Sequence, residues 1–424
     1  MRVYIDILEK VFKQNFRNLS IIVQLILTAL LAFYVAWNLG ANDVANSMGT
    51  SVGSKVLTLR QALVIAGVLE FTGAVAFGQN VSETLATQVA NPALFAETPQ
   101  VLMLGMVSVL AACGVWLQIA TSQGWPVSSS HGIVGAIAGF SWVAAGRAAV
   151  DWDSLGRISL AWLLTPLVSG VVAMLFYSLV KRWILERQDS LAQLREWIPW
   201  LSAILLGVFG VIVFPTLFER PFWSSLPIPP QDLSIAAGAL AAICLSLASW
   251  NQLERLSALE NGNSDQTQKN QASERILGGF QVVSACFVAF AHGSNDVGNA
   301  IASLAAIAHI LQSGAVPLDG LAIPYWILIL GGLGIVAGLA FQGKNVIATI
   351  GEGIIPLQPS IGFCAEISTA IAILLASRFG LPVSTSHAIV GSVVGIGLLQ
   401  RWQSVRFQTV KSVVLAWTPG LGIP

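Results

Sequence analysis

Charged residues are scarce in this sequence. Only 10% of its 424 residues are Asp, Glu, Lys or Arg, whereas a soluble globular chain carries about 25%. So few charges could not keep a water-facing surface soluble. Neither sign dominates, because 21 basic residues balance 21 acidic ones, so we expect no basic surface for nucleic acid.

Cysteine is also rare, with four residues that each stand alone inside an apolar stretch: Cys113, Cys244, Cys286 and Cys364. The sequence has no paired Cys motif and no Cys/His cluster, so no metal centre or other cofactor is predicted. A cleavable signal peptide is not evident either. Residues 1–20 mix apolar and charged side chains and predict an amphipathic lead-in along the membrane surface, with a disordered tail as the alternative.

Hydrophobic residues are abundant, at 55% of the chain, and the mean hydropathy is +0.74. Many stand in blocks close to the ~20 residues that a helix needs to cross a bilayer. Clear examples are residues 21–37, 62–77, 101–120, 160–180, 198–218, 233–250 and 326–341. We therefore predict an all-α, multi-pass protein embedded in the lipid bilayer of a cell membrane, either a plasma or a bacterial inner membrane.

The chain contains two related halves. NLGANDVAN at 38–46 is matched by HGSNDVGN at 292–299, GQNV at 78–81 by GKNV at 343–346, and PVSSSHGIVG at 126–135 by PVSTSHAIVG at 382–391. The matches keep their order along the chain, which indicates an internal duplication. Between the halves lies a polar stretch at 251–275, which predicts a solvated linker.

This pattern predicts four parts: the lead-in at 1–20, a first transmembrane repeat at 21–250, the linker at 251–275 and a second repeat at 276–424. Duplicated halves in a membrane protein favour a secondary transporter, with its substrate site near the midplane where the repeats meet. Gly, Pro and Ser interrupt several apolar stretches, and broken helices at membrane depth are tolerated only where they are buried or line a cavity.

Each half carries an Asn-Asp pair followed by a further Asn, which gives the six residues Asn42, Asp43, Asn46, Asn295, Asp296 and Asn299. An Asp and an Asn three residues apart share one face of a helix. Their oxygens suit small, hard cations such as sodium. A charge at membrane depth costs at least ~2.5 kcal/mol, so two matched charges favour function over the alternative, helix capping at the interface.

The PVS motifs predict two helices that begin inside the membrane, with Pro126 and Pro382 in their first turns. Free N–H groups and hydroxyls at such a helix start can bind an oxyanion. The predicted ligands of this oxyanion are Ser128, Ser129, Ser130, Ser384, Thr385 and Ser386. The histidines that follow, His131 and His387, are predicted to position these groups, with a proton relay as the alternative. A Ser-rich helix start at the membrane surface is the simpler interpretation.

Two further acids, Glu70 and Glu366, lie within apolar segments. They do not correspond between the halves, since Glu70 falls opposite Ile335 and Glu366 opposite Leu110. Lipid exposure would be costly, so both are expected to face the bundle interior. We predict that they bind sodium, with protonation or a neutral structural role as alternatives.

The motifs thus bring up to four carboxylates near a predicted anion site, and neither motif contains a basic residue. A bare anion would be repelled there. Bound sodium ions, or protons on the carboxylates, would reverse the local field. Cotransport of an anion with a cation follows as a hypothesis.

The sequence resembles the inorganic phosphate transporter family through GANDVANSMGTSVGS at 40–54, LRQA at 59–62, both PVS motifs and HGSNDVGNAI at 292–301. The motif residues of the first half are more similar to those of the sodium-coupled branch than to those of the proton-coupled bacterial metal-phosphate carriers. The resemblance implies two inverted repeats, re-entrant helical hairpins that carry the PVS motifs, and a homodimer. It also implies sodium and substrate roles for Asn42, Asp43, Asn295, Asp296, Glu70 and Glu366, and phosphate binding by Ser129, Ser130, Thr385 and Ser386.

The second repeat is expected to be shorter than the first. It ends in VVLAWTPGLGIP, whereas the matching segment of the first repeat runs on for a full crossing. The resulting prediction is a symporter of inorganic phosphate with sodium. Proton-coupled phosphate or metal-phosphate symport and sulfate permeation stay open, since hydroxyls and amides bind either tetrahedral anion. An ion channel fits the duplicated halves less well, and an enzyme would not need the Ser-His motif twice. The orientation in the membrane is left open by the sequence.

Overall fold

The computed structural model describes residues 19–123, 127–218, 228–259, 266–318, 320–343 and 355–400, with positions 406, 408, 410 and 411 beyond them. These residues form helices joined by short connections, and one isolated β-bridge joins Ala90 to Val150. The predicted lead-in at 1–20 falls almost entirely outside the described residues.

Among the described residues, nine helices are long and apolar enough to cross a membrane. They are α2 (Ile21–Gly53), α3 (Leu59–Phe77), α5 (Pro99–Ser122), α7 (Trp152–Val180), α8 (Ser190–Ile212), α10 (Pro230–Leu259), α11 (Gln266–Ser313), α12 (Tyr325–Gln342) and α14 (Pro359–Arg378). The all-α, multi-pass class is therefore confirmed. Seven of the nine overlap the predicted apolar blocks, whereas α11 and α14 were not among them.

Shorter elements complete the bundle: α4 (Gln79–Thr87), η1 (Pro92–Phe95), α6 (Ser129–Ala145), η2 (Arg147–Ala149), the π-helical turn η3 (Lys181–Leu185), α9 (Phe214–Phe218) and α15 (Thr385–Gln400). Two of these, α6 and α15, begin at the PVS motifs, and their first residues are buried inside the bundle. We call α5 and α6 together the first hairpin, and α14, the turn at 379–384 and α15 the second hairpin.

The two halves pack against each other reciprocally. A Cβ at Gly40 of α2 would lie 1.9 Å from the carbonyl oxygen of Ile335 in α12, and a Cβ at Gly293 of α11 would lie 2.0 Å from that of Glu70 in α3. These are matching positions of the duplication, so the first long helix of each half contacts the second long helix of the other. Such exchanged contacts are typical of a two-fold relation. That the repeats are inverted stays a prediction.

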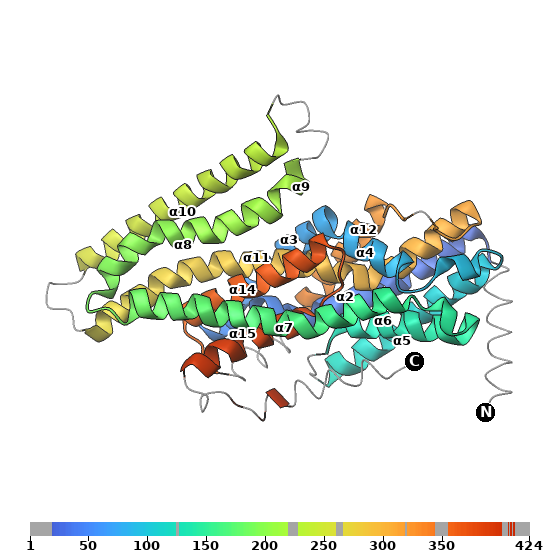
Figure 1. The fold of residues 1–424 in the computed structure, drawn as a ribbon, viewed down its shortest axis with the longest axis horizontal. Coiled ribbons are helices and arrows are strands. Elements are labelled where there is room, and N and C mark those ends of the chain that lie inside the picture. The colour runs from blue at the N-terminus through green and yellow to red at the C-terminus, as the bar shows by residue number, and fades with distance from the viewer. Residues whose placement is uncertain are drawn as a thin grey trace.

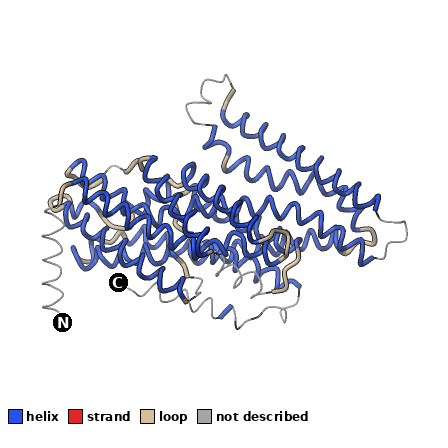
Figure 2. Tube along the Cα trace, turned by 180° about the vertical axis from the view of Figure 1, so that it is seen from behind, coloured by secondary structure: helices blue, strands red, loops and turns tan. Residues whose placement is uncertain are grey.

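Helices α8, α9 and α10 form an arm that diverges from the rest of the bundle, as Figure 1 shows from one side and Figure 2 from behind. The stretch predicted as a linker is helical at both ends, because α10 continues to Leu259 and α11 begins at Gln266. Apolar side chains explain this, since Leu253 and Ala272 are buried within it. The division of the chain into four parts stays a prediction.

Candidate functional site

The Asn-Asp motifs lie in the middle of the two helices that cross the bundle centre. In α2, every residue from Asn38 to Ser51 is buried. In α11, residues 291–300 are buried as well. Both helices continue through the motif without a break, so the polar groups are held at depth on regular helical backbone.

Thr385, the first residue of α15, joins the two motifs. Its hydroxyl donates to Oδ2 of Asp296 at 3.1 Å and accepts from Nδ2 of Asn46 at 3.4 Å. Asn46 also donates to Oδ1 of Asp43 at 3.0 Å, one turn earlier on its own helix. A single hydroxyl at the start of α15 therefore contacts both halves.

Ser129, the first residue of α6, makes the matching set of contacts. Its hydroxyl accepts from Nδ2 of Asn299 at 3.2 Å and lies beside the carboxylate of Asp43. Asn299 donates to Ser130 as well, at 3.1 Å, and the Ser130 hydroxyl donates to the carbonyl oxygen of Val383 at 2.9 Å. Each short helix thus contacts the aspartate of its own half and the second asparagine of the other half.

We call this group the central cluster; its members are Asp43, Asn46, Ser129, Asp296, Asn299 and Thr385. Four of its oxygens are buried without a hydrogen-bond donor, namely Oδ2 of Asp43, Oδ1 of Asn46, Oδ1 of Asp296 and Oδ1 of Asn299. A buried acceptor left unpaired costs ~1–3 kcal/mol. Oxygens are the ligands that hard cations prefer, so the donor set fits a small cation such as sodium.

His292 lies between two carboxylates beside the central cluster. Its Nδ1 is 3.1 Å from Oε2 of Glu70 and its Nε2 is 3.0 Å from Oδ2 of Asp296. Ligand atoms of Asp43, His292 and Asp296 all fall within 4.8 Å of one another. Glu70 also accepts from the Ser47 hydroxyl at 2.9 Å. Glu70 is therefore connected to the cluster through His292, to which the sequence analysis gave no role.

Glu366 sits in a separate polar group. Its Oε1 accepts from Thr50 and Ser51 at 2.7 Å each and from Gln281 at 3.1 Å, and its Oε2 accepts from Ser284 at 2.7 Å. Ser284 is about 18 Å along α11 from Asp296, at 1.5 Å per residue. The structure therefore does not bring Glu366 to the central cluster, and hydroxyl and amide donors already satisfy both of its carboxylate oxygens.

The remaining predicted residues lie around the hairpins. Ser128 and Ser384 cap α6 and α15, and each hydroxyl accepts a hydrogen bond at 3.3 Å from the backbone N–H of the histidine that follows. The rings of His131 and His387 are 4.8 Å apart and perpendicular, so the two helix starts meet there. The Ser386 hydroxyl is 3.2 Å from that of Ser384.

Asn42 and Asn295 contact the hairpins instead of the central cluster. Asn42 donates to the Thr121 hydroxyl at 3.3 Å, and Asn295 donates to the Ser377 hydroxyl at 2.9 Å. Thr121 and Ser377 lie near the ends of α5 and α14. Of the predicted cation ligands, the structure thus brings four into the cluster, connects Glu70 to it, and separates Asn42, Asn295 and Glu366.

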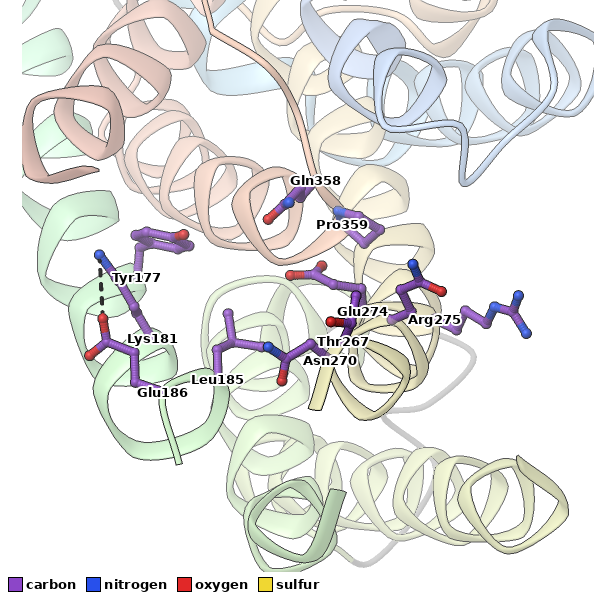
Figure 3. A pocket seen from close by; sticks show the side chains of 11 residues that line it. Tyr177, Lys181, Leu185, Glu186, Thr267, Asn270, Glu274, Arg275, Gln358 and Pro359 are labelled. Atoms are coloured by element: carbon purple, nitrogen blue, oxygen red, sulfur yellow. Dashed lines mark ion pairs between the residues drawn. The ribbon is translucent and has the colours of Figure 1, made fainter. Parts of the chain in front are cut away.

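A cavity of about 730 Å³ lies elsewhere, at the end of the bundle where α7 ends and α11 and α14 begin. Figure 3 shows Lys181 paired with Glu186 on one side and the Arg275 side chain directed away from the others. Glu274 accepts from the backbone N–H and hydroxyl of Ser360 at 2.8 and 2.7 Å. Lys181 and Glu186 thus form an ion pair at this cavity, which is distinct from the central cluster, whose members are buried.

Comparisons with a family model and with individual known proteins indicate the same family. The model of the phosphate transporter family matches residues 39–422. The chain is 40% identical to the inorganic phosphate transporter 2-1, chloroplastic, of Arabidopsis thaliana, over 92% of this chain and 68% of that protein. It is also 40% identical to a candidate phosphate permease of Chlamydia muridarum, over 91% and 92% of the two chains.

Among solved structures, the chain is similar to one described as the sodium-dependent phosphate transporter. The two share 34% sequence identity and a TM-score of 0.84, and the alignment covers 94% of this chain and 95% of the other. The similarity thus extends over both halves, including both hairpins and the helices that carry the Asn-Asp motifs.

Proposed function

This chain belongs to the phosphate transporter family, and from that premise we propose that it is a secondary active symporter that carries inorganic phosphate together with sodium ions. It is a multi-pass membrane transporter and not an enzyme. The observation that carries the sodium assignment is the set of four buried oxygens without donors, placed in matching pairs on α2 and α11. The sodium dependence named for the similar solved structure supports it.

Phosphate would bind where the hairpin helices begin. Two helix starts meet at the centre of the bundle, each with hydroxyls and with backbone N–H groups at the positive end of its dipole. The neighbouring carboxylates of Asp43 and Asp296 would repel a bare anion. Sodium on their open oxygens would reverse this field, so that each ligand favours binding of the other.

The burial of the central cluster supports an occluded state, because Asp43 and Asp296 are each only 1% exposed. For either side of the membrane to reach the site, the starts of α6 and α15 must move relative to α2 and α11. The contacts of Ser129 and Thr385 with both halves are the ones that this movement would break. We propose a homodimer in a cell membrane as the assembled form.

Proton coupling is the second candidate, because His292 places one chargeable group between two buried carboxylates. The test is uptake of ³²P-phosphate into proteoliposomes under an inward sodium gradient, an equal potassium gradient, or a pH gradient. Of these three conditions, we expect concentrative phosphate uptake only under the inward sodium gradient. Asp43→Asn and Asp296→Asn should reduce uptake to the level of empty liposomes, since each removes a carboxylate charge from the cluster. Uptake driven by pH and indifferent to sodium would contradict the sodium assignment, and sulfate uptake in place of phosphate would contradict the substrate.

A further inference from the structure

We propose that the two residues of each Asn-Asp pair have different roles in coupling. The aspartate belongs to the central cluster, whereas Asn42 and Asn295 are positioning residues that fix the hairpins in the geometry that binds phosphate. The identity of the two ligands rests on the function proposed above. The division of roles rests on the contacts of the asparagines themselves.

Asn295 uses all of its polar atoms on the second hairpin. Its Nδ2 donates to the Ser377 hydroxyl at 2.9 Å and to the carbonyl oxygen of Leu381 at 3.1 Å, and its Oδ1 accepts from the backbone N–H of Val383 at 3.2 Å. The side chain is fully buried. Both of its N–H donors and its carbonyl oxygen are therefore committed, unlike the open oxygens of the central cluster.

The three groups that Asn295 contacts span the turn of the second hairpin. Ser377 is in the last turn of α14, Leu381 is within the turn, and Val383 directly precedes Ser384, the capping residue of α15. Backbone groups in a buried turn have no helical partner and need one from elsewhere. Asn295 provides that partner for one carbonyl and one N–H, and so holds the start of α15 at a fixed place relative to α11.

The first half repeats one of these contacts. Asn42 donates to the hydroxyl of Thr121 at 3.3 Å, and Thr121 is the position that matches Ser377 in the duplication. The same residue type thus contacts a hydroxyl in the last turn of the long hairpin helix in both halves. Because the contact occurs at matching positions of both halves, we infer that it is a shared structural feature of the repeat.

Asp296 is the next residue on α11, and it faces a different partner. Successive residues on a helix are rotated by about 100°, so Asp296 reaches the hydroxyl of Thr385 and keeps its Oδ1 open, while Asn295 reaches the turn. One short segment of α11 therefore contacts both the predicted cation ligands and the hairpin. A cation that fixes this segment also fixes the hairpin, which is a physical link between the two ligands.

The test measures the two affinities separately on the purified, full-length protein. Binding of ²²Na⁺ is measured without phosphate, and binding of ³²P-phosphate is measured with saturating sodium and with none. The variants are Asn295→Ala and Asn42→Ala, with Asp296→Asn as the comparison on the same helix. Ser377→Ala and Thr121→Val remove a single hydroxyl each and serve if an asparagine variant does not purify as a monodisperse protein.

For the asparagine variants we expect sodium affinity without phosphate to stay within about twofold of wild type, while phosphate affinity at saturating sodium falls by about tenfold, equivalent to ~1.4 kcal/mol. The factor by which sodium improves phosphate binding should shrink, and reciprocity requires an equal loss in the effect of phosphate on sodium. The hydroxyl variants should shift the same quantity by about threefold, since each loses one hydrogen bond. Asp296→Asn should lose sodium binding itself.

A tenfold or larger loss of sodium affinity in Asn295→Ala without phosphate, with phosphate affinity at saturating sodium unchanged, would make Asn295 a cation ligand and overturn the proposal. Unchanged binding of both ligands would overturn it as well. If wild-type phosphate binding does not respond to sodium, sodium coupling fails as a function. The positioning role is then decided by phosphate affinity alone, which Asn295→Ala must still weaken by about tenfold.

Discussion

At the residue scale, His292 distinguishes the two halves. The matching first-half position is Leu39, so one repeat carries an imidazole between two carboxylates and the other carries an alkyl group. Glu70 and Asp296 are both buried, and a buried carboxylate is stable only with partners. His292 therefore connects the acid of α3 to the central cluster.

We predict that His292→Ala abolishes phosphate uptake and lowers thermal stability. Removing one partner of a buried ion pair costs ~3–5 kcal/mol, because the remaining charges are left uncompensated. The matched control is His309→Ala, which removes a half-buried imidazole from the same helix and should leave uptake near wild type. The measurements are the unfolding midpoint in detergent and uptake in proteoliposomes. An equal loss in both variants would mean that the effect belongs to α11 in general.

The members of the central cluster could be predicted because the sequence repeats itself, whereas Glu70 was singled out as an acid within an apolar segment. Asp43, Asp296 and the hairpin hydroxyls stand in duplicated motifs, so their pairing was visible from spacing alone. His292 and Ser284 match Leu39 and Leu31 of the first half, so no repeated polar pattern pointed to them, and their roles come from contacts with Glu70 and Glu366 on other helices. One local signal was available, because His292 is four residues before Asp296 and thus on the same helical face.

At the element scale, α11 and α14 lie outside the apolar blocks given as examples, although each contains a stretch as apolar as those of α3 and α8. α11 is 48 residues long and carries the second Asn-Asp motif near its middle. Polar groups are tolerated there because partners on other helices satisfy them, such as Thr385 for Asp296 and Glu366 for Ser284. Hydropathy along one segment marks these helices as membrane crossings, but it does not show which polar side chains meet inside the bundle.

The reciprocal helix contacts give a prediction at this scale. Gly293→Ala should prevent correct assembly, because its Cβ would lie 2.0 Å from the carbonyl oxygen of Glu70 and backbone cannot move aside cheaply. Gly207→Ala in α8 is the control, since a Cβ there meets nothing within 4 Å. It should be neutral or stabilising by up to ~1 kcal/mol, the helix preference of Ala over Gly. Thermal unfolding of the purified proteins measures both, and an unaffected Gly293→Ala would contradict the close packing of α3 on α11.

At the scale of the whole molecule, the two ends of the bundle differ in charge. The end where α7 stops and α8 and α11 start carries an ion pair between Asp189 and Lys269 and a group of basic residues: Lys181, Arg182, Arg187, Arg195 and Arg275. The opposite end, where α7 starts and Ala90 bridges to Val150, carries Glu83, Glu97, Asp151 and Asp153. The fold thus gathers these basic residues at one end of the bundle and these acidic residues at the other, which the sequence alone did not show.

This asymmetry predicts the orientation that the sequence left open. Lys and Arg near the ends of membrane helices favour the cytoplasmic side, so the end with the cavity of Figure 3 should face the cytoplasm. The start of α2 should then face outside, since that helix runs from Ile21 toward Val56, which packs beside Gly278 near the start of α11.

Labelling with a membrane-impermeant thiol reagent on intact cells tests the orientation. The background variant replaces the four native cysteines, and single cysteines are introduced as Glu97→Cys, at an exposed position on the acidic end, and Asn270→Cys, beside the cavity. We expect labelling of Glu97→Cys in intact cells and of Asn270→Cys only after permeabilisation. The reverse pattern would mean that the basic end faces outward and would contradict the predicted orientation.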